Sequence, residues 1–96
     1  MANKESAYVI AFKATSMESR SEIMGWLKEC GAVHVLADVW FLKSHYPFAG
    51  DIDHEITRFR EIDGQLIVLK LNQATDYAHA NLSEQASSWI DKNLAE

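Results

Sequence analysis

The stretch at residues 65–71, QLIVLKL, decides the fold because it is the clearest strand in the chain. Gly64 and Asn72 flank it as turn residues, and a short apolar run with such ends favours a strand over a helix. Alternation divides its apolar residues between two faces, with Ile67, Leu69 and Leu71 on one and Leu66 and Val68 on the other. A strand that is apolar on both faces predicts a central position in a sheet covered on both sides.

The rest of the chain alternates between strand and helix patterns. Period-two alternation marks strands, and apolar residues at three- and four-residue steps mark helices. The expected elements, in order, are a strand at 7–13, a helix at 16–30, a hairpin of strands at 33–36 and 39–43, a helix at 52–62, the strand at 65–71 and a helix at 82–94. The expected caps are Thr15 for the first helix, Asp51 or Asp53 for the second, and Asn81 or Ser83 for the third.

This order predicts an α+β fold, namely a ferredoxin-like β-α-β-β-α-β sandwich with an added C-terminal helix, in a single domain over residues 1–96. In that architecture two helices cover one face of a four-stranded antiparallel sheet. The other face would expose a large apolar patch, since several strands are apolar on both sides. We therefore expect a homodimer through this face, with Val9, Trp40, Leu66 and Val68 at the interface.

Composition limits the possible classes of protein. The 96 residues include 48% hydrophobic and 24% charged residues, which is an ordinary globular composition. No window is long and apolar enough for a membrane span, and the N-terminus has no apolar signal region, so we expect a cytoplasmic protein without membrane association. Cys30 is the single cysteine, which excludes an intramolecular disulfide. The net charge of −5 disfavours nucleic-acid binding over a broad surface.

Four sequence segments carry a family resemblance. They are YVIAFK at 8–13, GAVHVLADVWFLKS at 31–44, QLIVLKL at 65–71 and EQASSWIDKNL at 84–94. Together they resemble the small CRISPR spacer-acquisition subunit family, and most closely its stand-alone relatives labelled SinR. The resemblance implies a ferredoxin-like homodimer that is either a metal-dependent nuclease or a dimeric DNA-binding scaffold.

The chain departs from the family pattern at the end of the first strand. The family has an aspartate there, which holds a metal ion together with its copy across the dimer axis, whereas this chain has Lys13. An ammonium group cannot ligate a divalent cation. We therefore lean towards a protein that is not an enzyme, with no catalytic residue, no metal site and no cofactor.

Basic residues provide the candidates for binding a partner. Lys13, Lys43 and Lys70 lie at or near the ends of expected strands, where they could gather into a small phosphate site, and Arg58 and Arg60 are close in sequence. The leading interpretation is a non-catalytic homodimeric scaffold that acts on a nucleic-acid or protein partner.

Acidic residues keep two alternatives open. A metal-dependent nuclease using Mg²⁺ or Mn²⁺ would need a displaced site, either at Asp38, which has His34 nearby, or in the cluster of Asp51, Asp53, His54 and Glu55. The structural interpretation of that cluster is a helix cap followed by acidic residues in the first helical turn. The second alternative is an acidic interaction protein that mimics nucleic acid, which the net charge of −5 favours.

Overall fold

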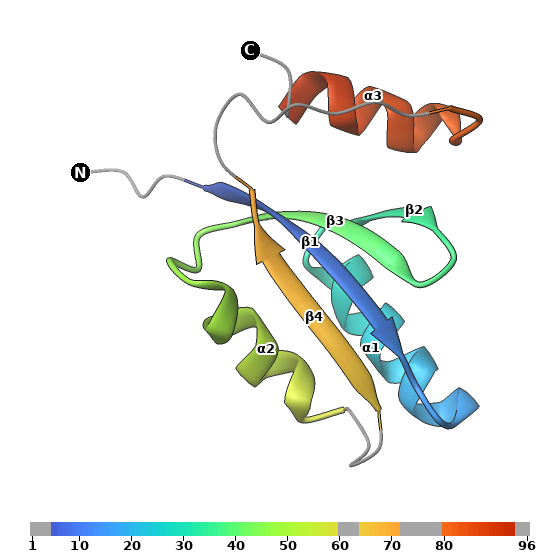
Figure 1. Ribbon diagram of the computed structural model, residues 1–96, viewed down its shortest axis with the longest axis vertical. Helices are drawn as coiled ribbons and strands as arrows, with labels where there is room; N and C mark the ends of the chain where they lie inside the picture. The colour runs from blue at the N-terminus through green and yellow to red at the C-terminus, as the bar shows by residue number, and fades with distance from the viewer. Residues whose placement is uncertain (1–4, 60–63, 72–79, 94–96) are drawn as a thin grey trace.

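The computed structural model describes residues 5–59, 64–71 and 80–93, which form one antiparallel sheet and three helices (Figure 1). The elements are β1 (Ser6–Lys13), α1 (Met17–Glu29), β2 (Val33–Leu36), β3 (Val39–Ser44), α2 (Ala49–Thr57), β4 (Gln65–Lys70) and α3 (Glu84–Asn93). The element order matches the expected one. The strands lie in the order β2-β3-β1-β4 and every neighbouring pair is antiparallel. The fold is therefore α+β. β1 and β3 are the inner strands, and β4 lies at an edge of the sheet, so the predicted central position of residues 65–71 is wrong.

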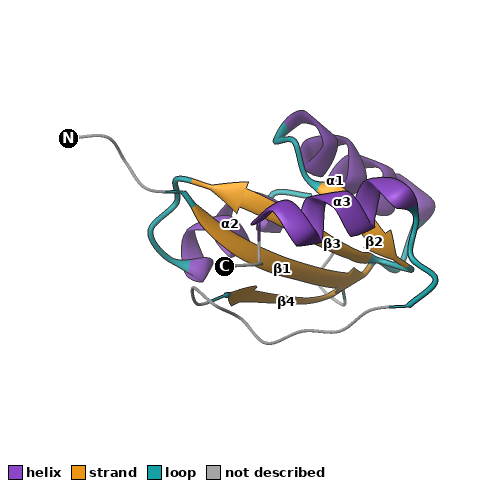
Figure 2. Ribbon diagram, turned by 90° about the horizontal axis from the view of Figure 1, so that it is seen from above, coloured by secondary structure: helices purple, strands orange, loops and turns teal. Residues whose placement is uncertain are grey.

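Helices α1 and α2 lie on the same side of the sheet (Figure 2). Their apolar residues at helical spacing, such as Ile23 and Leu27 of α1 and Ile52 of α2, pack against the β1 side chains Tyr8 and Ile10 in one core. These five side chains are almost completely buried. We call this side of the sheet the covered face.

The observed starts of the first two helices agree only in part with the caps expected from the sequence. Ser16, and not Thr15, caps α1, and its side chain accepts a hydrogen bond from the Ser19 amide at 3.1 Å. The second helix begins earlier than expected, at Ala49, so that Asp51 lies in its first turn and accepts from the Phe48 amide at 3.2 Å. An acidic residue at the N-cap or in the first turn can accept hydrogen bonds from free backbone amides and interacts favourably with the helix dipole. The sequence alone therefore does not distinguish these two positions.

The third helix and the hairpin confirm their predictions. Ser83 caps α3, since its hydroxyl accepts from the Ala86 amide at 3.1 Å. The hairpin between β2 and β3 turns at Ala37 and Asp38 as expected, and Ala37 takes a positive φ of 42°. Ile62 and Leu94, the last residues of the expected helices at 52–62 and 82–94, lie outside the described residues. No helix in the described part of the chain is long and apolar enough to span a membrane.

Candidate functional site

The second side of the sheet carries exposed apolar side chains of the strands. Val9 and Ala11 of β1 lie beside Leu69 and Ile67 of β4 in the antiparallel register, and Val39 of β3 lies on the other side of Ala11. Because side chains alternate along a strand, all five point away from α1 and α2. We call the surface made by these five residues the open face.

Helix α3 covers one end of this side. Ile90 packs on Ala7, near the start of β1, and the Trp89 ring meets the Phe41 ring of β3 edge-on at 5.5 Å between centroids. The shielded end is therefore the end where β1 begins, and the open face lies towards the end of β1. These contacts show that α3 covers part of this side of the sheet.

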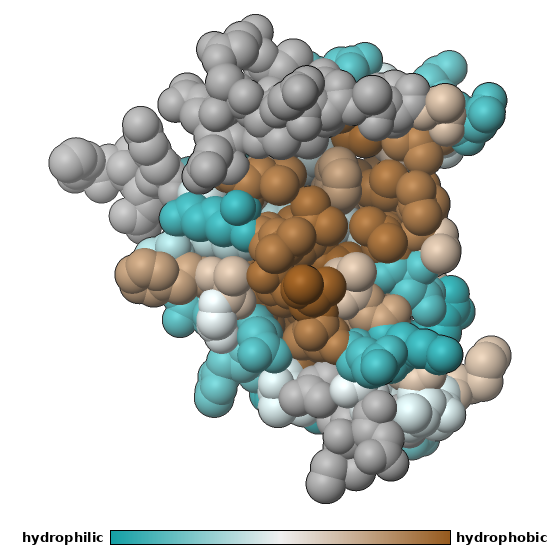
Figure 3. Space-filling view, viewed as in Figure 1, coloured by the Kyte–Doolittle hydropathy of each residue, from teal (hydrophilic) through white to brown (hydrophobic). Residues whose placement is uncertain are grey.

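The open face is exposed next to this helix. Ile67 and Leu69 remain 54% and 50% exposed, whereas Val9, Ala11 and Val39 are half-buried. Figure 3 shows a hydrophobic area in the middle of the view, with hydrophilic surface along parts of its border. An exposed apolar patch with a polar rim is typical of a surface that binds another protein.

Three of the four predicted interface residues lie on the other side of the sheet. Trp40 is 2% exposed in the core beneath the helices, and Leu66 and Val68 pack against that core. Their assignment to the interface is corrected, because side chains that pack on the covered face are not part of the open face. Val9 does lie on the open face. The sequence put Ile67 on the opposite face from Leu66 but gave no signal for which of the two faces the helices cover.

The strand-end lysines do not come together. Lys13 and Lys43 are on the same side of the sheet as the open face, but Lys43 pairs with Ala7 at one end of β1 and Lys13 ends the strand. Six residues separate these positions along β1, which is about 20 Å of extended chain. Lys70 pairs with Tyr8 and so points to the covered side. The structure therefore does not assemble the phosphate site expected from these three lysines.

The arginine candidates are engaged or not described. Arg58 forms an ion pair with the Glu55 carboxylate at 3.0 Å, and its guanidinium lies 5.0 Å from the centroid of the Phe59 ring. Arg60 lies outside the described residues. Lys70 donates to the Pro47 carbonyl at 2.9 Å. Because these contacts already engage their charged groups, Arg58 and Lys70 are less available to bind a partner.

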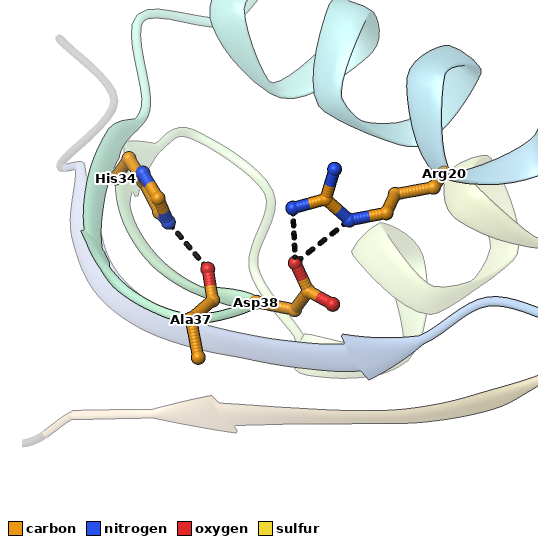
Figure 4. A network of polar contacts seen from close by, with 4 residues as sticks. All are labelled: Arg20, His34, Ala37 and Asp38. Atoms are coloured by element: carbon orange, nitrogen blue, oxygen red, sulfur yellow. Dashed lines mark hydrogen bonds and ion pairs between the residues drawn. The ribbon is translucent and has the colours of Figure 1, made fainter. Parts of the chain in front are cut away.

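Asp38 and His34 do not form an acid and base pair (Figure 4). Both Nε and Nη2 of Arg20, in α1, donate to Asp38 Oδ1, at 3.1 and 2.9 Å. The His34 ring turns instead to the Ala37 carbonyl and stacks on the Trp40 ring at 4.8 Å between centroids. This network fixes the hairpin tip against α1, which is a structural role for Asp38.

The acidic cluster at the start of α2 is also used locally. From the first turn of α2, Asp51 accepts a hydrogen bond from the Phe48 amide. Asp53 accepts a hydrogen bond from the Thr57 hydroxyl at 3.3 Å, and Glu55 pairs with Arg58. Within the described ranges, no group of three or more His, Cys, Asp or Glu side chains is arranged to hold a metal ion. The arrangement fits first-turn acids better than a set of ligands.

The titratable groups with displaced pKa values lie away from the open face. Burial, with Asp51 nearby, raises the pKa of the Tyr8 hydroxyl, which donates to the Tyr46 carbonyl. Burial and the carboxylates of Glu29 and Glu55 raise the pKa of the Cys30 thiol. A raised pKa reduces the thiolate fraction, so this environment does not activate Cys30 as a nucleophile.

Comparisons with known proteins add a likeness of fold. No protein-family model matches the sequence, and no curated protein matches it. The chain is similar to a crystal structure described as a hypothetical protein TT1823 from Thermus thermophilus, with a TM-score of 0.64 and 13% sequence identity over 79% of this chain and 93% of that chain. At this identity the likeness concerns the fold alone.

Proposed function

We propose that this chain is a non-catalytic binding protein that works as a homodimer joined through the open face, on a ferredoxin-like scaffold. The element order β-α-β-β-α-β, the antiparallel strand order β2-β3-β1-β4 and two helices on one face support the ferredoxin-like assignment. The same features support a relationship to the small CRISPR spacer-acquisition subunit, to which the sequence segments are similar.

The observation that carries the proposal is the exposure of Ile67 and Leu69. Each is about half exposed on the edge strand β4, beside the apolar β1 residues Ala11 and Val9. Fully burying an Ile or Leu side chain contributes about 1.5–3 kcal/mol, so covering the exposed halves contributes about 1 kcal/mol each. A second copy of the chain offers the same flat apolar surface, and two such surfaces bury each other around a two-fold axis.

The contacts of the acidic residues support a role without catalysis. Asp38 is held by Arg20, and Asp51 and Glu55 are held within or beside α2. Lys13 stands where the resembled family has its metal-binding aspartate. A nuclease would need carboxylates converging on a metal ion, whereas these carboxylates are separated and engaged with the protein itself.

The distribution of charge favours a protein partner over nucleic acid. The net charge is −5, and Lys13 and Lys43 lie about 20 Å apart along the sheet while Lys70 points to its other side. Phosphate backbones bind where several cations lie close together, because each contact adds to the release of counterions. The acidic interaction protein considered from the sequence is consistent with this preference.

Sedimentation and cleavage assays test the proposal together. Analytical ultracentrifugation of the purified chain at micromolar concentration should show a dimer, and incubation with RNA or double-stranded DNA and Mg²⁺ or Mn²⁺ should show no cleavage. A monomer would refute the dimer. Cleavage that is lost on addition of a chelator and in Asp38→Ala would refute the non-catalytic role and favour the nuclease.

A further inference from the structure

Strand β4 forms one edge of the sheet, and in the described part of the chain no strand lies beyond it (Figure 2). The Leu71 amide donates to the Ala7 carbonyl of β1 at 2.8 Å. Hydrogen-bonded residues alternate along an antiparallel strand, so Leu69 and Ile67 also bond to β1. The backbone N–H and C=O groups of the alternate residues therefore point away from β1. These residues are Leu66, Val68 and Lys70.

The opposite edge of the sheet is protected, whereas the β4 edge is regular. Strand β2 has four residues, its register shifts between His34 and Leu36, and α3 lies against it. A short strand, an irregular register and a covering helix are features that prevent strand addition. Strand β4 has six residues in continuous register with β1 and contains no proline. Its outward backbone groups are therefore suited to pairing with another extended chain.

A strand added at this edge would meet different surroundings on its two sides. On the open side its neighbours are Ile67 and Leu69, which are 54% and 50% exposed. On the covered side its neighbours are Leu66 and Val68, and α2 packs beneath β4. Apolar side chains of the added strand would pair with Ile67 and Leu69 on the open side, where residues directly opposite each other share a face.

Helix α2 carries an exposed acidic residue along this margin of the sheet. Ile52 is buried against the core. Glu55 lies towards α1, since burial and then the carboxylates of Glu29 and Glu55 raise the pKa of the Cys30 thiol at the end of α1. Around the helix axis Asp53 lies about 100° from Ile52 in one direction and Glu55 about 60° in the other. Asp53 is therefore on the side of α2 that faces away from α1, next to the β4 edge.

The position of Asp53 along the edge follows from the start of α2. The Lys70 ammonium donates to the Pro47 carbonyl at 2.9 Å, so the helix begins near the end of β4 and runs back along the strand (Figure 1). From Ala49 to Asp53 the helix rises about 6 Å, which corresponds to about two residues of strand. Asp53 therefore lies level with Val68. A basic residue opposite Val68 would complement its charge.

We propose that the β4 edge binds an extended segment of a partner protein as an additional antiparallel strand. The segment carries apolar residues opposite Ile67 and Leu69 and a basic residue opposite Val68, which agrees with the net charge of −5. This inference rests on the proposed role in binding a protein partner. It does not depend on the proposed dimer, because face-to-face packing uses side chains and leaves the outward backbone groups of β4 free.

A capped peptide with the sequence Thr-Val-Lys-Val-Thr is the probe. Paired antiparallel with residues 66–70, its lysine lies opposite Val68 and its valines lie opposite Leu69 and Ile67. The backbone N–H groups of its lysine and threonines then face β4, whereas those of its valines face solvent. N-methylation of the lysine amide should abolish binding. N-methylation of a valine amide is the matched control and should preserve it.

Amide hydrogen exchange of the isotope-labelled protein, followed by NMR, locates the contact. Without peptide, the outward amides of Leu66, Val68 and Lys70 should exchange quickly, and those of Ile67 and Leu69 slowly. Peptide at about ten times its dissociation constant should slow exchange at the three outward amides about tenfold and leave the other two unchanged. Asp53→Asn should weaken peptide binding about 2–5-fold through loss of an exposed charge pair.

The outcomes separate this inference from the proposed function. An unchanged exchange pattern, in a protein that sediments as a dimer, would overturn the inference and leave the proposed function intact. Slow exchange at the three outward amides before peptide is added would also overturn it, since the chain itself or a second copy would already occupy the edge. Equal binding of the two N-methylated peptides would exclude strand addition. Binding at the outward amides of a protein that sediments as a monomer would support the edge site and refute the dimer.

Discussion

Replacing Ile67 by alanine tests the apolar contact on which the proposed dimer depends. The side chain is 54% exposed on β4, so the proposed dimer buries about half of it in each copy. On the scale for burying a whole Ile side chain, its truncation costs about 1 kcal/mol per copy and about 2 kcal/mol per dimer. A change of this size weakens the dissociation constant about 30-fold.

Sedimentation equilibrium over a series of concentrations measures this change, and Met17→Ala serves as the matched control. Met17 is 78% exposed at the start of α1, on the layer that packs on the covered face, so its truncation should leave dimerisation unchanged. Both variants should keep the native circular dichroism spectrum, because neither side chain belongs to the buried core. Equal dissociation constants for Ile67→Ala and the parent chain would refute the reasoning.

Three further predictions concern the contacts that build the scaffold. Ser83→Ala should lower the free energy of unfolding by about 1 kcal/mol through loss of the α3 cap, measured by denaturant titration, whereas Ser88→Ala, the same change at an exposed position within α3, should be neutral or slightly stabilising. Asp38→Ala should lower the free energy of unfolding by about 0.5–1 kcal/mol in the parent chain, and it should have no such effect when Arg20 is already alanine. Equal losses in both backgrounds would contradict a coupled pair. Tyr8 has a pKa raised above its ordinary 10.0 in the folded state, so its contribution to stability is complete below about pH 10 and is lost as the pH rises through the folded-state pKa. Unfolding midpoints measured across this range should therefore fall less steeply for Tyr8→Phe than for the parent chain, and parallel curves would count against a buried neutral phenol.

The order of elements could be predicted from the sequence because each element has a local cause. Alternation in β1 places Tyr8 and Ile10 on one side, and the period-two runs on either side of Ala37 and Asp38 imply a hairpin. Such signals involve residues within a few positions of each other. They determine which side chains share a face and where a turn can form.

The assignment of faces could not be predicted because it depends on contacts between distant parts of the chain. Trp40 and Phe41 are adjacent and aromatic, yet one is buried beneath the helices and the other meets α3. Periodicity separates them without saying which side the helices take. The pairing of Arg20 with Asp38 likewise cannot be predicted from sequence spacing. The two residues are 18 positions apart, and the contact forms only when the hairpin tip docks on α1.

The proposed dimer and the charge of the chain together limit the kind of partner that we propose. Two copies of a chain with net charge −5 carry twice that charge, so the dimer repels a phosphate backbone at long range more strongly than one copy does. The basic side chains in the described part of the chain do little to offset this repulsion locally. Lys13 lies at the rim of the proposed contact, Arg58 is paired with Glu55, and Lys70 donates to a backbone carbonyl. The negative field around the proposed dimer would attract a basic protein surface. In that dimer the outer surfaces of α1 and α2 would be available twice to such a partner.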